Sequence, residues 1–159
     1  GYKYLTQEFS LNELLDSVLK NYTHRIAKKG VQLNYSKINE DLLVKLDRYS
    51  IEQIFAQLID NACKFTDVGE INIKVENLNG LVSVDIVDTG IGMSEEYINN
   101  LFKPFSQEDS GYTRPYDGNG LGLALCKKYC DLNNIQLKVE SKKNIGTHIN
   151  LLIPHAQIN

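Results

Sequence analysis

The sequence has 159 residues, of which 42% are hydrophobic and 23% are charged, and its formal net charge is −3. These values are typical of one globular domain with a hydrophobic core, and they argue against a nucleic-acid surface or a polybasic membrane patch. No apolar run approaches the roughly 18 residues of a membrane-spanning helix; we therefore expect a cytoplasmic domain without direct membrane contact, in a parent protein that can itself be membrane-anchored.

The first predicted element is an amphipathic helix. Ser10 and Glu13 form a capping-box pattern, and apolar residues then recur at helical spacing up to Ile26. Basic residues followed by Gly30 are typical of a helix end. The pattern therefore predicts one continuous helix over Leu11–Lys29.

The middle of the chain predicts two short strands, a second amphipathic helix and a β-hairpin. These elements are expected at residues 31–35, 42–46, 51–62 and 71–86. The hairpin has the clearest pattern, because apolar and polar residues alternate on both sides of Asn79-Gly80, which favours a tight turn.

The rest of the chain begins with a short helix at residues 94–100, capped by Ser94. Residues 102–119 are polar and contain glycine and proline, which favours a functional loop such as a lid. A helix at 120–132 follows. Its apolar side is expected to carry Leu121, Leu125, Tyr129 and Leu132, and the final strands are expected at 136–141 and 147–153.

This order of elements predicts an α+β fold, a two-layer sandwich in which helices cover one face of a mixed sheet. The three cysteines, Cys63, Cys126 and Cys130, do not have the spacing of a metal site. We expect them to be free thiols on small, buried or half-buried side chains.

Three polar residues of the second predicted helix form one stripe. Gln57, Asn61 and Lys64 lie at positions i, i+4 and i+7, beside the apolar face. An amide oxygen is a hard ligand that suits Mg²⁺, and a nearby lysine suits a phosphate. Taken alone, such a stripe is more often simply the solvent-exposed face of a helix.

Two glycine-containing segments suit a ligand as well. In Asp88–Gly92, which follows a strand, the glycines permit close approach to the backbone, and the carboxylate of Asp88 can accept a hydrogen bond from an exocyclic amine. Gly118–Gly122 leads into a helix, whose exposed amides suit phosphate. It matches neither the P-loop nor GxGxxG, because residue 123 is leucine, and it follows a polar loop, which argues against a Rossmann unit. Taken alone, each segment fits an ordinary structural turn.

The motifs together resemble those of sensor histidine kinases. QLIDNACKFT resembles the N box, DTGIGM the G1 box, LFKPFSQ the F box and GNGLGLAL the G2 box, and Gly146-Thr147 resembles the final GT element. They occur in the family's order from about residue 51 to residue 153. The chain thus resembles the catalytic ATP-binding domain, which implies the Bergerat fold shared with gyrase-type topoisomerases, Hsp90 and MutL.

This resemblance implies that ATP and Mg²⁺ bind at the motifs. Asn61 would be a Mg²⁺ ligand, with Gln57 as a second candidate, and Lys64 would contact phosphate. Phe65 would pack on the adenine ring, and Asp88 would accept a hydrogen bond from the adenine amino group.

The other implied contacts come from the glycine segments and the lid. Gly90 and Gly92 would let the nucleotide lie against the backbone, and Thr147 would sit near the base through water. Phe102 and Phe105 would anchor the lid. The residues implied to present amides to the phosphates are Gly118, Gly120, Leu121 and Gly122. The residues implied to act in phosphoryl transfer are Asn61, Lys64 and Arg114.

One position bears on the type of reaction. ATP-hydrolysing members of the superfamily carry a glutamate four residues before the Mg²⁺-binding asparagine, where it is the general base for water. This sequence has Gln57 there, and an amide cannot accept a proton. Transfer to a protein acceptor is therefore favoured over hydrolysis.

The acceptor of the family is a histidine followed closely by an acidic residue and a proline on a dimerising helix. None of His24, His148 and His155 has this context. The resemblance therefore implies transfer to a histidine-bearing dimerisation domain of the same protein, and from there to a response-regulator receiver domain. We interpret residues 1–9 as a leader or linker from the missing dimerisation domain, 10–155 as the catalytic domain and 156–159 as a tail.

Three alternative functions stay open. A serine-directed kinase of the anti-sigma type shares the fold, but such chains are compact and lack the long first helix. An ATPase of the same superfamily would need the general base that Gln57 does not supply. A nucleotide-sensing module would bind ATP and regulate a partner without transferring phosphate.

Overall fold

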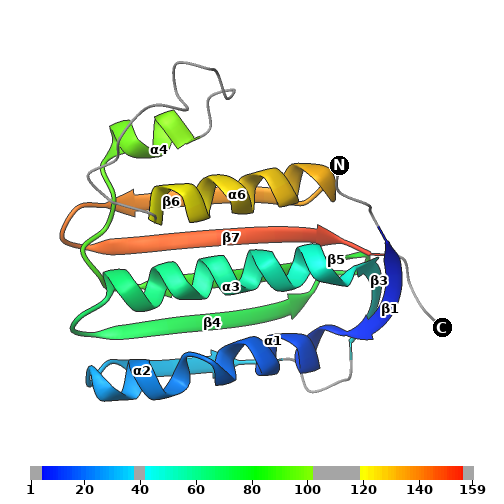
Figure 1. Cartoon of the computed structure of the whole chain (residues 1–159), viewed down its shortest axis with the longest axis horizontal. Helices are drawn as coiled ribbons and strands as arrows, with labels where there is room; N and C mark the ends of the chain where they lie inside the picture. Colours follow the sequence, from blue (N-terminus) through cyan, green and yellow to red (C-terminus); the bar gives the residue numbers. More distant parts are fainter. Residues whose placement is uncertain (1–4, 38–41, 102–118, 156–159) are drawn as a thin grey trace.

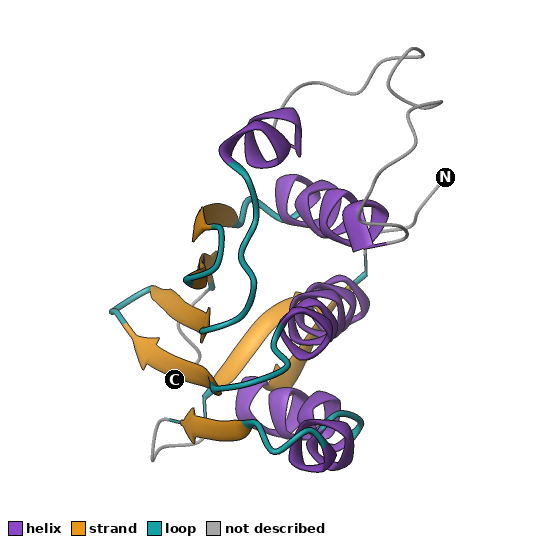
Figure 2. Ribbon diagram, turned by 90° about the vertical axis from the view of Figure 1, so that its left-hand side faces the viewer, coloured by secondary structure: helices purple, strands orange, loops and turns teal. Residues whose placement is uncertain are grey.

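The computed structural model describes residues 5–37, 42–101 and 119–155. Their helices lie on one face of a central sheet, as Figure 1 shows, and Figure 2 shows the two layers side by side. This arrangement confirms the predicted α+β two-layer sandwich. No helix of these residues is long and apolar enough to cross a membrane.

The elements carry the labels of Figure 1. In chain order they are β1 (Thr6–Ser10), α1 (Leu11–Lys20), α2 (Thr23–Lys28), β2 (Gln32–Ser36), β3 (Leu43–Asp47), α3 (Arg48–Phe65), β4 (Glu70–Asn77), β5 (Leu81–Asp88), α4 (Glu95–Leu101), α6 (Asn119–Leu132), β6 (Gln136–Lys142) and β7 (Gly146–Pro154).

The main sheet has five strands among the described residues, in the order β2-β4-β5-β7-β6. β2 and β4 run parallel, whereas the other neighbours run antiparallel, so the sheet is mixed as predicted. Asp88 of β5 and Thr147 of β7 are register partners. Both are buried, which places their side chains next to each other on the helix-covered face.

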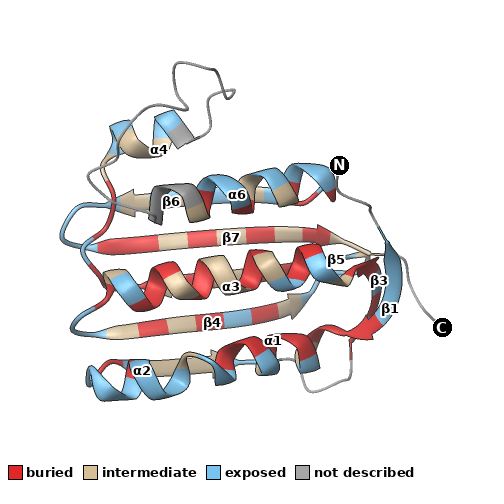
Figure 3. Cartoon of the chain, in the orientation of Figure 1, coloured by how far each residue is buried: buried red, intermediate tan, exposed pale blue. Residues whose placement is uncertain are grey.

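The hydrophobic core lies between this face and the helices, and Figure 3 shows buried positions along α1, α3, β4 and β7. The apolar residues alternate along the strands because successive side chains point to opposite faces. Buried core residues of α3, β4 and β5 include Ile51, Ile54, Phe55, Leu58, Ile71, Ile73, Val75, Val82, Val84 and Ile86. Most other polar residues of the strands, unlike Asp88 and Thr147, point to the opposite face, which we call the open face.

The predicted local signals for turns and caps are confirmed. The Ser10 hydroxyl accepts a hydrogen bond from the Glu13 amide at 3.2 Å, and the Ser94 hydroxyl accepts one from Tyr97 at 3.1 Å. Gly30 ends α2 with a φ of +78°, a conformation that glycine adopts without strain. The hairpin turn has φ angles of +52° and +96° at Asn79-Gly80, as tight turns of this type require.

The prediction of one continuous N-terminal helix is wrong, because α1 and α2 are separate helices. The amides of Asn21 and Tyr22 donate to carbonyls three residues back, at 3.1 and 2.9 Å, and this closes α1. Asparagine, tyrosine and threonine at this point all have low helix propensity. Tyr22 and Ile26 still pack on the core, so the helical spacing of apolar residues continues across the break between α1 and α2.

Residues 6–10 form a strand that the sequence pattern did not predict. β1 pairs antiparallel with β3, from Thr6 opposite Asp47 to Ser10 opposite Leu43, and the two strands form a small second sheet. The first three residues of β1 are exposed and only the last two are buried. An alternation this short carries no readable signal.

The predicted apolar side of α6 is also wrong. Leu125 and Leu132 are 41% and 49% exposed, whereas Leu123, Cys126 and Cys130 are fully buried. α6 packs against α3, and small thiol side chains fit a close helix–helix contact. All three cysteines are free and buried, as predicted.

Candidate functional site

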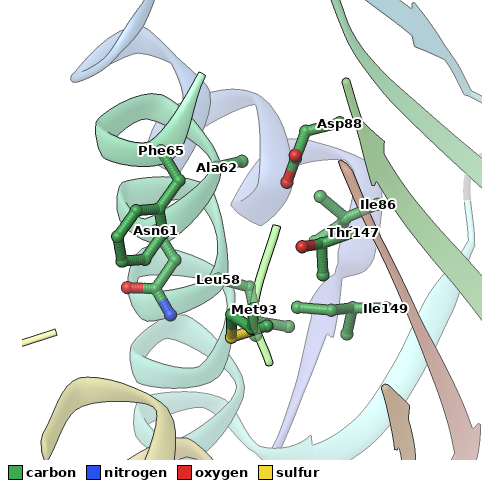
Figure 4. Close-up of a pocket in the computed structure, with 9 residues that line it drawn as sticks. All are labelled: Leu58, Asn61, Ala62, Phe65, Ile86, Asp88, Met93, Thr147 and Ile149. Carbon is green, nitrogen blue, oxygen red and sulfur yellow. The ribbon is translucent and has the colours of Figure 1, made fainter. Parts of the chain in front are cut away.

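A narrow cleft lies between α3 and the neighbouring ends of β5 and β7 (Figure 4). The residues that line it are Leu58, Asn61, Ala62, Phe65, Ile86, Asp88, Met93, Thr147 and Ile149. The oxygen atoms of Asp88 and Thr147 point from the strands towards α3 in this view. The cleft thus joins an apolar floor to a few polar groups, an arrangement typical of small-molecule sites.

The cleft has two sides that are built differently. We call Asp88, Gly90 and Thr147 the strand side, because β5, the turn after it and β7 supply them. We call Asn61 of the cleft lining, together with Gln57 and Gly122 outside the lining, the helix side, because α3 and α6 supply them. Each side contains residues that the sequence had singled out.

On the strand side, Asp88 is only 7% exposed. Its Oδ1 accepts a hydrogen bond from the amide of Gly90 at 2.9 Å. Burial raises the pKa of the Asp88 carboxyl, whereas the amides of Gly90 and Thr147 and the hydroxyl of Thr66 lower it. A buried carboxylate held in this way can accept a hydrogen bond from a ligand that enters the cleft.

The turn after Asp88 is held against α3 by backbone contacts. The amide of Ile91 donates to the carbonyl oxygen of Phe65, the last residue of α3, at 3.0 Å. A Cβ atom at Gly90 would lie 2.1 Å from that same oxygen. Only glycine therefore fits between the helix end and the turn, and this requirement explains Gly90 independently of any ligand.

The same turn is held against the β6–β7 hairpin. The amide of Asn144 donates to the carbonyl oxygen of Ile91 at 2.6 Å. Gly92 has a φ of +71°, and a Cβ atom there would lie 2.0 Å from the carbonyl oxygen of Lys142. The backbone from Asp88 to Gly92 is thus fixed between a helix and a hairpin.

Ser141 fixes Thr147. The Ser141 hydroxyl lies 2.8 Å from the hydroxyl of Thr147 and 3.0 Å from the carbonyl oxygen of Gly146, and it accepts a hydrogen bond from the amide of Met93 at 2.7 Å. One side chain of β6 thereby joins β7 to the segment that follows the turn.

On the helix side, Asn61 is a buried polar residue, 7% exposed, that borders the cleft. Gln57 lies one turn earlier on α3 and reaches across to α6, since a Cβ atom at Gly122 would lie 2.4 Å from Gln57 Oε1. The contact is between a flexible side chain and a glycine. The two helices thus meet here through one flexible side chain.

Lys64 lies outside the cleft lining. Its Nζ forms an ion pair with Asp60 Oδ2 at 2.9 Å, within α3, and its side chain is 50% exposed. The predicted phosphate contact of Lys64 therefore requires the ammonium group to leave Asp60, which a long, flexible lysine side chain can do.

Several predicted site residues lie outside the described residues: Phe102, Phe105, Arg114 and Gly118. Gly120 and Leu121 lie within α6, whose backbone begins at Asn119, as predicted for a helix that starts with a glycine-rich segment. The structure thus brings together Asn61, Phe65, Asp88 and Thr147 around the cleft, beside the turn of Gly90 and Gly92, whereas Gln57 lies outside the cleft lining.

Sequence reasoning missed the apolar lining and the supporting hydroxyls. Met93 follows the Asp88–Gly92 turn directly, and Ile86 and Ile149 are the inward positions next to Asp88 and Thr147 on their strands. Strand alternation would have found Ile86 and Ile149, whereas Met93 lies outside the strands. No local pattern identifies Ser141, because its partners come from other segments.

Comparison with known proteins gives the following matches. A family model described as histidine kinase-, DNA gyrase B- and HSP90-like ATPase matches residues 46–157. The chain is 35% identical over 153 residues to hybrid signal transduction histidine kinase B of Dictyostelium discoideum, which covers 92% of this chain and 8% of that protein. It is 35% identical over 152 residues to autoinducer 2 sensor kinase/phosphatase LuxQ of Vibrio cholerae, covering 92% and 18%. The chain therefore spans a small part of these relatives.

Solved structures give matching results. The catalytic domain of histidine kinase ThkA, in a nucleotide-free form, matches with a TM-score of 0.79 at 31% identity, over 95% of this chain and 98% of that one. ThkA in complex with response regulator protein TrrA matches with a TM-score of 0.75 at 28% identity, over 96% and 42%. Full-length ShkA in complex with AMPPNP matches with a TM-score of 0.80 at 22% identity, over 99% and 32%, and at that identity the likeness shows the fold alone.

Proposed function

From the premise that the chain belongs to the family of histidine kinase-, DNA gyrase B- and HSP90-like ATPases, we propose that it binds ATP with Mg²⁺ and donates the γ-phosphoryl group to a histidine. That histidine belongs to a separate dimerisation domain of the same protein. The observation that carries the proposal is the cleft that joins Asp88 and Thr147 to Asn61.

The strand side suits the purine base of ATP. A buried carboxylate whose Oδ1 already holds the Gly90 amide offers its remaining acceptor capacity to the exocyclic amine of adenine. Phe65 and Met93 border the same space with apolar surface, as a flat aromatic ring requires. In the proposal, Thr147 contacts the base through water.

The helix side suits the phosphates. The first amides of α6 have no partners within the helix, and they favour an anion at its N-terminus. In the proposal the amides come from residues 118–122, and Lys64 adds a positive charge after it leaves Asp60. The lid residues Phe102, Phe105 and Arg114 keep their predicted roles.

The donor set also fits Mg²⁺. The described residues contain no group of three or more His, Cys, Asp or Glu side chains able to hold a metal. Mg²⁺ commonly binds one or two protein oxygens together with substrate phosphates and water, and the buried amide of Asn61 supplies one such oxygen. Gln57 is the second candidate. The ion would neutralise phosphate charge, while the chain orients the triphosphate.

Transfer is favoured over hydrolysis because the residue one turn before Asn61 on α3 is not a carboxylic acid. Gln57 occupies the position one turn earlier and contacts Gly122, and an amide cannot remove a proton from water. Catalysis then depends on position and charge neutralisation, so no covalent intermediate on this chain is needed.

The proposed partners are the histidine-bearing dimerisation domain and a response-regulator receiver domain. Support comes from relatives described as hybrid and sensor histidine kinases and from the ThkA complex with a response regulator. Because the chain spans only 8% and 18% of two of these relatives, the activity of the whole protein is part of the proposal.

The binding step is tested by calorimetric titration of ADP with and without Mg²⁺. We expect Mg-ADP to bind, and we expect Asn61→Ala to abolish the dependence on Mg²⁺. Asn150→Ala is the matched control, because Asn150 lies on the open face, where it donates to Ser83 and Asp85. Absence of binding at millimolar nucleotide would contradict the proposal.

The transfer step is tested with γ-labelled ATP and a separately produced dimerisation domain. We expect the label on that domain as an acid-labile phosphohistidine, and none when its histidine is replaced by glutamine. Binding without label would instead indicate a nucleotide-sensing module. Release of labelled phosphate without an acceptor would indicate an ATPase.

A further inference from the structure

The hydroxyl of Thr66 is buried, and the part of the chain that the structure describes gives it no well-formed hydrogen bond. Thr66 directly follows α3 and is 0% exposed, and its Oγ1 makes no hydrogen bond of ordinary geometry to the described residues. Leaving a buried hydroxyl unpaired is unfavourable, and buried polar groups without a partner are rare in folded proteins. This hydroxyl therefore requires an explanation.

The Thr66 hydroxyl lies beside the turn that holds Asp88. A Cβ atom at Gly90 would be only 2.9 Å from Thr66 Oγ1, and the amide of Gly90 is the group that donates to Asp88 Oδ1. Thr66, at the end of α3, and Gly90, in the turn after β5, thus both lie near the carboxylate of Asp88.

The backbone of Thr66 is fixed in this place. The ammonium group of Lys29, which directly follows α2, donates to the carbonyl oxygens of Cys63 and Thr66, at 2.5 and 3.4 Å, and to Asp67 at 3.2 Å. These contacts stabilise the C-terminal end of α3, where carbonyl groups lack partners within the helix. The hydroxyl of Thr66 is therefore carried on a backbone segment that Lys29 holds in place.

We propose that Thr66 is a positioning residue for Asp88. When a purine base that carries an exocyclic amine enters the cleft, the Thr66 hydroxyl donates to the Asp88 carboxylate and orients it as the acceptor for that amine. The inference rests on the proposed function, since it concerns the same nucleotide site, and it adds a residue that contacts no ligand itself.

The charge state of Asp88 supports this role. Burial raises the pKa of its carboxyl, and the nearby Thr66 hydroxyl is one of the groups that lower it. The charged side chains of the elements packed around it lie elsewhere. Glu70 and His148 are hydrogen-bonded on the open face, to Asn34 and Asp85, Lys142 follows the outward alternation of β6, and Lys64 is paired with Asp60. Among the described residues, neutral donors thus govern how far Asp88 stays ionised.

The test compares Thr66→Val, which removes the hydroxyl at nearly constant shape, with Thr66→Ser, which keeps it. Binding of Mg-ADP is measured by calorimetry over a range of pH, after thermal unfolding has verified that both variants fold. We expect Thr66→Val to weaken binding about tenfold at neutral pH, the effect of losing one hydrogen bond to a charged group. We expect Thr66→Ser to bind like the wild type.

The pH profile separates positioning from packing. Binding should fall as pH decreases through the pKa of Asp88, because the protonated carboxyl no longer presents two acceptors. Without the Thr66 hydroxyl this pKa rises, so the loss of binding should move to higher pH in Thr66→Val and stay in place in Thr66→Ser. In an Asp88→Asn background, Thr66→Val should cause no further loss, because the two residues act as a unit.

Two results would overturn the inference while leaving the proposed function intact. One is a Thr66→Val variant that binds Mg-ADP as the wild type does. The other is equal weakening in the valine and serine variants with an unshifted pH profile, which would indicate a packing role. A wild-type chain that does not bind Mg-ADP would instead refute the proposed function, and the inference with it.

Discussion

On the strand side of the cleft, backbone hydrogen bonds hold the turn after Asp88 against both α3 and the β6–β7 hairpin. On the helix side, α3 and α6 meet through the flexible side chain of Gln57 at Gly122. The first kind of contact leaves no room for movement, because a backbone atom cannot rotate away. The second kind adjusts by a change of rotamer.

This difference indicates where specificity and adaptation lie. In the proposed site, a base would be recognised by groups that are already in place, which reduces the entropy lost on binding. The phosphates differ in number between the proposed substrate and product, and the helix side would adjust to them. The experiments below are ordered by expected effect, and each compares a change on one side with a matched change elsewhere.

The largest difference is expected between alanine substitutions at two glycines. In Gly90→Ala the new methyl group would lie 2.1 Å from the carbonyl oxygen of Phe65, so the turn must move away from α3. We expect a loss of about 3 kcal/mol in the free energy of unfolding, as for overpacked sites, and no detectable binding of ADP. Denaturant unfolding and calorimetry measure the two effects.

Gly122→Ala introduces the same methyl group on the helix side. Its nearest neighbour is Gln57 Oε1 at 2.4 Å, which can rotate away, and alanine favours helix over glycine by about 1 kcal/mol. We therefore expect the free energy of unfolding to stay within about 1 kcal/mol of the wild type, since the two effects oppose each other. Equal destabilisation by both variants would remove the distinction between the two sides.

Asp88→Asn should have the largest effect on binding without a loss of stability. The amide oxygen of asparagine can keep the hydrogen bond from Gly90, but its NH₂ group then faces the amino group of the base, donor against donor. We expect ADP to bind about 100-fold more weakly. Calorimetry measures the affinity, and the unfolding free energy should be unchanged or slightly higher.

The sign of the pH dependence follows from the same carboxyl. Because burial raises its pKa in the folded chain, proton uptake favours the folded state. Asp88 therefore opposes folding at neutral pH and ceases to do so as pH falls through the raised pKa. Nucleotide binding is lost over that same range. Asp88→Asn should remove both effects. If the affinity of that variant for nucleotide still decreases at low pH as in the wild type, another titrating group is responsible.

Ser141→Ala should have an intermediate effect, because Ser141 does not line the cleft but contacts Thr147 of the strand side. It removes the acceptor for the Met93 amide and the contact with Thr147. We expect the free energy of unfolding to fall by about 1–2 kcal/mol and ADP affinity to fall about fivefold.

Ser83→Ala is the control for Ser141→Ala. It also removes a hydroxyl contact between strands, that with Asn150 at 3.0 Å, but on the open face. Weaker ADP binding in Ser83→Ala would show that the effect comes from the sheet as a whole.

The sequence predicted the elements that depend on local pattern, and it predicted the candidate residues that local motifs place. The hairpin around Asn79-Gly80 and the cap at Ser10 are examples, since each is set by a few neighbouring residues. The buried positions of α3 follow from helical spacing in the same way. Strand alternation places Asp88 and Thr147 on one face, and register then makes them neighbours.

Features that depend on distant partners could not be predicted. The buried side of α6 contains two cysteines in place of the larger Leu125, because close packing on α3 selects for size and not only for hydrophobicity. β1 exists because β3 pairs with it. The proposed role of Thr66 and the contacts of Ser141 arise where separate segments meet, and no spacing along the chain reveals such contacts.

The smallest effect is expected at Lys64, the helix-side cation that lies outside the cleft. Its ion pair with Asp60 has an N–O distance of 2.9 Å, with side chains 50% and 21% exposed. Exposed pairs of this kind contribute between zero and about 1 kcal/mol. Asp60→Asn frees the lysine for phosphate, and we expect ADP to bind about twofold more tightly, with a larger gain at low salt because screening is weaker there.

Asp131→Asn is the matched control, because it breaks the ion pair with Lys127 on α6, also four residues apart, at 2.8 Å. It should leave ADP affinity unchanged at every salt concentration. Weaker binding in Asp60→Asn would mean that Asp60 orients the lysine towards the phosphates and does not compete with them. The helix side would then be pre-organised like the strand side. The two sides would differ only in whether backbone atoms or side-chain atoms make the contacts.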